Sequence, residues 1–176
     1  MIIATCSPCF SRYEDARKHI DEEFGILNEI GASKHAGNVA VNRELLAELC
    51  EKEDNLAEAT KHLKAALKHR TAIQKNDDTD GVAAAKAYTL YELGRVYNEQ
   101  EQWAKARKRL LAALAIRRDR HRGREDVDEG YALILHELGR ACLELGMSRR
   151  TLALAVTFQV SRCRKHDDFC CTRVCC

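Results

Sequence analysis

The side chains best suited to bind another molecule recur at intervals of three and four, which places them on single faces of helices. Two such sets occur, one of them with two tyrosines beside an arginine. The sets are Tyr88, Tyr91, Glu92, Arg95, Asn98 and Glu99, and then His136, Glu137 and Arg140. Tyrosine rings give contact area at low entropy cost, and arginine fixes an acidic or carbonyl group. The pattern predicts a face that binds a peptide or helix; the alternative is an ordinary solvated helix face.

Catalytic motifs are missing from the sequence. It contains no phosphate-binding glycine loop, no HExxH and no nucleophile elbow. The nearest approach is the pair His136-Glu137, which we interpret as part of the binding face. We therefore expect a protein that is not an enzyme and that needs no cofactor.

Cysteine is frequent, with nine residues, but seven of the nine lie at the two ends of the chain. Such clustering does not favour a structural disulfide framework. The stretch "CSPC" has the spacing of a metal or redox pair, and "CRKHDDFCCTRVCC" offers five thiols and His166 that could take zinc. We predict weak metal affinity at most, and no resident metal site.

Basic side chains concentrate in one stretch, from Trp103 to Arg124, where a single acid opposes them. They are Lys105, Arg107, Lys108, Arg109, Arg117, Arg118, Arg120, Arg122 and Arg124. Residues 1–60, in contrast, carry twelve acidic and six basic side chains. This asymmetry gives two alternatives to the binding face: recognition of RNA or another anionic surface, and head-to-tail self-association. The alternative without a binding role is a charged, solvated helix face.

The elements that position these residues are predicted to be helices. The 176 residues include one Pro and 6% aromatic residues, and Ala, Leu, Glu, Lys and Arg dominate. No apolar run reaches the roughly 18–20 residues that a membrane-spanning helix needs. We expect an all-α, soluble, cytoplasmic protein.

An internal repeat organises the helices. The segment "LAELCEKEDNLAEATKHLKAAL" (46–67) aligns without a gap with "LGRVYNEQEQWAKARKRLLAAL" (93–114) at an offset of 47. "YALILHELGRACLELG" repeats the first half of this unit at an offset of 45, and "RYEDARKHIDEEF" repeats the second half. Small residues at Ala47, Gly94 and Gly139 in the first helix, and at Ala59 and Ala106 in the second, are predicted points of close backbone approach. The alignment of Trp103 with Leu56 predicts a core tryptophan.

These segments resemble the tetratricopeptide repeat. Its first-helix leucine, small residue and tyrosine match Leu93, Gly94 and Tyr97, and its second-helix pattern matches Ala106, Leu110 and Ala113. The period is longer than the family's, closer to the repeats of the kinesin light chain type, and no proline follows the second helix. The resemblance implies an α-solenoid of about three antiparallel hairpins, with a concave groove that binds a partner protein. The asparagine and lysine that clamp a terminal carboxylate in chaperone-binding members are lacking, so no ligand preference carries over.

The repeat predicts six helices, in two complete hairpins flanked by single helices. Their expected ranges are 11–30, 39–54, 55–74, 82–100, 102–118 and 127–146. Residues 1–10 are expected to be an extension, 11–160 the repeat domain, and 161–176 a disordered, cysteine-rich tail. The apolar stretch 152–160 fits either a covering helix or a strand.

Overall fold

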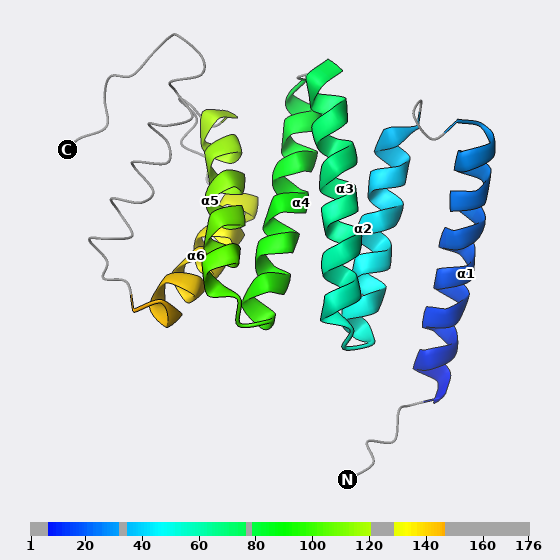
Figure 1. Cartoon of the computed structure of the whole chain (residues 1–176), viewed down its shortest axis with the longest axis horizontal. Coiled ribbons are helices and arrows are strands. Elements are labelled where there is room, and N and C mark those ends of the chain that lie inside the picture. Colours follow the sequence, from blue (N-terminus) through cyan, green and yellow to red (C-terminus); the bar gives the residue numbers. More distant parts are fainter. Residues whose placement is uncertain (1–6, 32–34, 77–78, 121–128, 147–176) are drawn as a thin grey trace. The chain divides into compact units, whose positions relative to one another are not determined.

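The computed structural model describes residues 7–31, 35–76, 79–120 and 129–146, and all regular structure within these ranges is α-helical. Figure 1 shows the helices in chain order. They are α1 (Ser7–Glu29), α2 (Ala36–Lys52), α3 (Leu56–Asn76), α4 (Asp80–Glu99), α5 (Trp103–Arg120) and α6 (Glu129–Glu144). The predicted all-α class is confirmed, and the helix ranges differ from the expected ones by only a few residues at each end.

The first helix begins earlier than predicted. The expected extension covers residues 1–10, but α1 starts at Ser7 and has Pro8 in its first turn. Proline fits there because the first amide groups of a helix have no partner within the helix, so the lost N–H costs nothing. The expectations for segments 152–160 and 161–176 lie outside the described residues.

The chain divides into two compact units, residues 1–82 and residues 83–176, and the boundary falls in the first turn of α4. The first unit contains α1, α2 and α3. The second contains nearly all of α4, together with α5 and α6. No helix among the described residues is long and apolar enough to cross a membrane.

The turns that end α2 and α4 have the same backbone geometry. Asp54 and Glu101 both have a φ of 58°, and they lie 47 residues apart, which is the offset of the sequence repeat. In the first turn Asn55 N–H donates to the carbonyl of Cys50 at 2.7 Å, and in the second Gln102 N–H donates to Tyr97 at 2.8 Å. Each turn thereby satisfies carbonyl groups at the end of its helix without a glycine.

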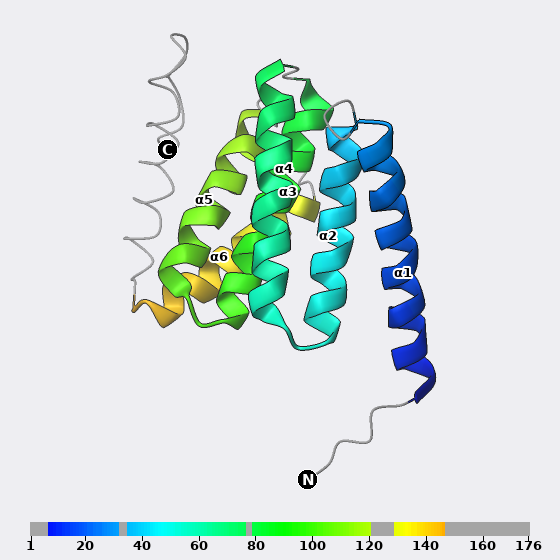
Figure 2. The same ribbon diagram turned by 45° about the vertical axis from the view of Figure 1, so that its right-hand side comes forward.

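The core of the first unit lies between α2 and α3, which pack along their length (Figure 2). The predicted close-approach residues Ala47 and Ala59 are buried, at 1% and 0% exposure, and Leu63 is buried between them at 1%. Small side chains at these positions let the two helix backbones approach each other. The predicted roles of Ala47 and Ala59 are therefore consistent with their burial.

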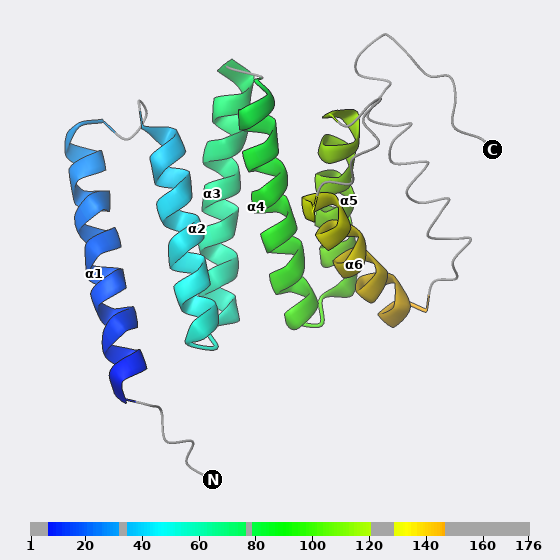
Figure 3. The same ribbon diagram turned by 180° about the vertical axis from the view of Figure 1, so that it is seen from behind.

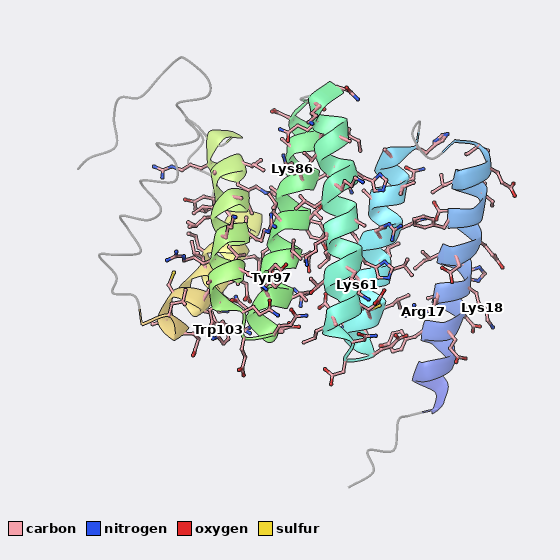
Figure 4. All side chains as sticks on the ribbon, in the orientation of Figure 1. Arg17, Lys18, Lys61, Lys86, Tyr97 and Trp103 are labelled. Carbon is pink, nitrogen blue, oxygen red and sulfur yellow. The ribbon has the colours of Figure 1, made fainter. Side chains whose placement is uncertain are left out.

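The first helix contacts α2 mainly through long side chains. The Arg17 guanidinium lies 2.8 Å from the Glu53 carboxylate and 3.8 Å from the Cys50 thiol. At a second contact between these helices, the Arg43 guanidinium of α2 lies 5.0 Å from the centre of the Phe24 ring of α1, a cation–π distance. Figure 4 shows Arg17 on the side of α1 that faces α2, and Lys18 pointing away from it. These contacts hold α1 against the α2–α3 hairpin.

The core of the second unit is built around Gly94. A Cβ placed on Gly94 would lie 2.6 Å from Cγ of Leu110, so α4 and α5 approach more closely here than any side chain would allow. A Cβ placed on Gly139 meets no described residue within 4 Å. The predicted close approach is thus confirmed at Gly94. At Gly139 it stays a prediction, because the helix expected to follow α6 falls outside the described residues.

Helix α6 packs on α5 in the second unit (Figure 3). Ile134 and Leu138 supply its buried side, each at 1% exposure. Trp103, at the first turn of α5 (Figure 4), is only partly buried, contrary to the prediction of a core tryptophan. Its ring lies 5.9 Å from the Arg140 guanidinium of α6, so it joins two helices at the surface. Gly146, at a φ of 65°, follows the end of α6.

Candidate functional site

The predicted face of α4 is a mixed aromatic and ionic surface. The rings of Tyr88 and Tyr91 lie 6.5 Å apart, tilted by 44°. One helical turn further on, the Arg95 guanidinium lies 2.7 Å from the Glu92 carboxylate and 2.9 Å from that of Glu99. The arginine is therefore held along the helix by two carboxylates of its own face. A partner's acidic group would have to compete with them for the guanidinium.

Two residues predicted for this face are not accessible on it. Asn98 is fully buried and Glu137 is 8% exposed. The Asn98 side-chain amide donates to the carbonyl oxygen of Glu137 at 3.0 Å and to its carboxylate at 2.7 Å. This pair fastens α4 to α6. The predicted accessibility of Asn98 and Glu137 is wrong, because α6 covers the end of α4.

The remaining predicted residues of α6 stay at the surface. His136 is exposed, and the side chain of Arg140 is 40% exposed. Arg140 lies 3.7 Å from the Glu137 carboxylate and over the Trp103 ring. The arginine is therefore positioned between two helices before any partner binds. Such preorganisation lowers the entropic cost of binding.

Helix α2 exposes an apolar residue that was not predicted from the sequence. Val41 stands at the position equivalent to Tyr88 and, one repeat later, to Leu133. Their exposed fractions are 42%, 48% and 44%, so all three helices present a large apolar side chain to solvent at the same repeat position. Leu45, one turn after Val41, is also 42% exposed. The offsets of 47 and 45 in the sequence were the signal that could have identified Val41.

Glu44 and Glu48 lie one helical turn apart on α2, but the Glu44 side chain contacts α3. The Arg70 guanidinium donates to both Glu44 carboxylate oxygens, at 2.9 and 3.3 Å, and their side chains are only 13% and 11% exposed. Glu48 is exposed. The exposed residues of α2 are Asn38, Val41, Leu45, Glu48 and Lys52.

The predicted basic residues of α5 differ in exposure. Lys105 and Lys108 are exposed, and Arg107, Arg109 and Arg118 are partly exposed. Arg117 is also partly exposed and turns toward α6, where its guanidinium carbon would lie 3.1 Å from a Cβ on Gly130. The side chain of Arg120, and residues Arg122 and Arg124, lie outside the described part of the structure. Of the nine predicted cations, only Lys105 and Lys108 are therefore fully exposed among the described residues.

Within the described ranges, no three His, Cys, Asp or Glu side chains gather as metal ligands would. Cys50 and Cys142 are buried, at 1% and 2% exposure, and burial raises the pKa of the Cys142 thiol. Such thiols are poor nucleophiles. Cys6 and the five cysteines of the C-terminal stretch, with His166, lie outside the described residues, as does the Cys9 side chain.

Two histidines of α3 make the first unit sensitive to pH. Burial lowers the pKa of His62 below 6.5, and the Arg43 guanidinium, 3.4 Å away, adds to the effect, while Glu58 opposes it. Burial also lowers the pKa of His69. Both imidazoles are therefore harder to protonate in the folded than in the unfolded chain.

We accordingly expect the free energy of unfolding to fall as the pH is lowered from about 7.5 to about 5.5, because the unfolded chain then binds more protons. Urea denaturation at several pH values measures the slope. His62→Gln should reduce it, whereas His19→Gln, on the exposed side of α1, should retain it. A slope unchanged by His62→Gln would contradict this assignment.

Comparisons with protein-family models, with curated proteins and with solved structures find no match for this chain. The candidate site therefore rests on the sequence pattern and on the geometry described above.

Proposed function

We propose that this chain is a protein-interaction scaffold, a tetratricopeptide-like α-solenoid that binds a partner peptide or helix. The binding faces belong to the first helix of each repeat, here called the first-type helix: α2 in the first unit, and α4 and α6 in the second. The second helix of a repeat, such as α3 or α5, is called the second-type helix. The observation that carries the proposal is the recurrence of an exposed apolar residue at one repeat position, as Val41, Tyr88 and Leu133. A single exposed apolar side chain is ordinary on a protein surface, so the argument rests on its recurrence at one repeat position in three helices.

The second unit offers the better-defined binding face. Tyr88 supplies an aromatic surface with a polar hydroxyl, and it lies against the ring of Tyr91. Arg95 and Arg140 provide positioned donors, the first between two carboxylates and the second over Trp103. Rigid aromatic and arginine side chains of this kind dominate binding energy at protein interfaces. Recognition would rest on this face, with no chemical turnover.

A peptide-display selection on the immobilised chain tests the proposal. Selected peptides should lose about 30-fold in affinity for the double variant Tyr88→Ala, Leu133→Ala, because removal of interface anchors costs about 2 kcal/mol or more. Both residues are exposed, so the variant should keep the helical circular dichroism of the wild type. The affinity should change little with salt.

The matched control is Lys105→Ala, Lys108→Ala, which removes two exposed side chains from α5. This variant should bind the same peptides as well as wild type. Peptide binding that survives the loss of Tyr88 and Leu133 would overturn the proposed face. Loss of binding in the lysine variant instead, with a steep decrease of affinity in salt, would favour recognition of an anionic surface or RNA.

A further inference from the structure

Helix α6 has a second exposed face, on a different side from the one proposed to bind peptides. Large and small residues alternate along it at spacings of three and four: Ala132, Leu135, Gly139 and Leu143. Leu143 is 76% exposed and Leu135 is 42% exposed. Several apolar side chains in line on one helix form a patch, which is more informative than a single exposed leucine.

The preceding repeat indicates what this face would contact. At an offset of 45, the four residues of α6 correspond to Ala87, Leu90, Gly94 and Asn98 of α4. All four of these are buried, and Gly94 lies against Leu110 of α5. The face of α6 therefore has the pattern by which a first-type helix packs against a second-type helix, but no described residue covers it.

Helix α1 has the complementary pattern, and its equivalent residues are less buried than those of α3. It has the pattern of a second-type helix, with Ala16 and Ile20 where α3 has Ala59 and Leu63. Those two residues of α3 are buried at 0% and 1%, whereas Ala16 and Ile20 are only partly buried. Among the described residues, no first-type helix precedes α1.

Two large apolar residues extend this flank of α1. Ile26 is 57% exposed, and Ile30, directly after the helix, is 54% exposed. They follow Ala16, Ile20 and Glu23 along the helix at spacings of three and four. A polar Glu23 stands where α3 has the buried Ala66, so the flank is apolar with one carboxylate in it.

We propose that α1 of a second copy of this chain docks on the Ala132–Leu143 face of α6, so that the two half-repeats form one hairpin between copies. Ile20 of one copy would then lie over Gly139 of the other, as Leu110 lies over Gly94 within the chain. The contact joins two different surfaces, so each dimer keeps one free α1 and one free α6, and association continues as the concentration rises.

The pattern of α1 fits this position better than the sequence that follows α6. The residues that would meet Gly139 and its neighbours from the following stretch are Thr151 and Ala155, in place of the Ala106 and Leu110 that meet α4. Helix α1 offers Ala16 and Ile20, the same small and large pair. A large apolar side chain opposite the glycine fills the space that alanine would leave open.

Charge also favours contact between the two ends. Helix α1 carries six acidic and three basic residues, whereas α5, which packs beside α6, carries seven basic residues and one acid. Opposite net charges on α1 and α5 raise the rate at which the first unit of one copy meets the second unit of another. Helix α6 itself carries three acidic residues and one arginine, so this attraction acts between the units and not within the docked face.

Sedimentation velocity of the full chain in reducing buffer, over about a hundredfold range of concentration, tests the proposal. Wild type should grow from the 19.9 kDa monomer to larger species as the concentration rises. Gly139→Leu should remain monomeric, because its side chain occupies the place of Ile20. The variant should fold, since no described residue lies within 4 Å of a Cβ at Gly139 and leucine is the better helix former. Gly81→Leu, at an exposed glycine of α4 with equal space, is the matched control and should associate like wild type.

A complementation experiment separates this contact from a symmetric dimer. Ile26→Lys, Ile30→Lys blocks the α1 surface at two exposed positions and should also give a monomer. Mixed with Gly139→Leu, it should form a heterodimer of twice the monomer mass and nothing larger, because only one intact α1 and one intact α6 remain. A wild type that stays monomeric at every concentration would overturn the proposal, as would variants that still associate alone or a mixture that does not associate.

Discussion

Replacing Gly94 with alanine is expected to lower the free energy of unfolding by about 1–3 kcal/mol, although alanine is the better helix former by about 1 kcal/mol. The new Cβ would lie 2.6 Å from Cγ and 2.7 Å from Cδ2 of Leu110, which is itself fully buried. The branch carbon of a buried leucine cannot move aside as a flexible chain end can, so the helices must separate. Urea denaturation followed by circular dichroism measures the loss.

Gly139→Ala is the matched control for this prediction. It places the same substitution at the equivalent position of α6, where no residue that the structure describes lies within 4 Å of the Cβ. The propensity gain then acts without opposition, and the free energy of unfolding should rise by about 0.5–1 kcal/mol. Equal effects of the two substitutions would show that close packing at Gly94 does not decide its identity.

A double variant tests the mechanism directly. Leu110→Ala alone should cost about 2–5 kcal/mol through the cavity that it leaves. In the Gly94→Ala background the same change should cost less, because the smaller side chain also removes the overlap. Additive costs would contradict the contact between these two residues as the cause.

Helix positions were predictable from the sequence because they depend on local periodicity. The spacing of apolar residues located all six helices, and the aligned small residues correctly identified Ala47, Ala59 and Gly94 as buried or closely packed. Gly139 has the same sequence context as Gly94, but no residue of the described ranges lies within 4 Å of a Cβ placed there. Its surroundings depend on what packs against α6, which the pattern of α6 alone does not specify.

The candidate site was less predictable because its polar residues are distributed by contacts between helices. Asn98 and Glu137 carry the spacing of an exposed face, yet each is buried by the other's helix. The turns at Asp54 and Glu101 adopt positive φ without glycine, so residue type gave no indication of them. Conversely, Val41 looks like a core residue by type, and only its repeat position marks it as exposed.

Glu44→Ala is expected to cost about 3 kcal/mol of stability, because it leaves the Arg70 guanidinium without its carboxylate in a site where the arginine side chain is 13% exposed. The two hydrogen bonds between these side chains link α2 to α3. The cost should appear as a lower urea midpoint with an unchanged slope. Glu48→Ala, one turn along the same helix and exposed, is the control and should change the midpoint little.

Removing both charges shows why Glu44→Ala destabilises the fold. It distinguishes the loss of the attraction between Glu44 and Arg70 from the cost of leaving the Arg70 charge buried and unpaired. Glu44→Leu together with Arg70→Met should recover most of the stability lost by Glu44→Ala, since a buried pair contributes little beyond what packed apolar residues of similar size provide. A double variant as unstable as the single one would contradict this account. The outcome also bears on recognition. If the expected loss is found, the Glu44 carboxylate is committed to Arg70, and α2 would contact a partner through its exposed residues, among them Val41, Leu45 and Glu48.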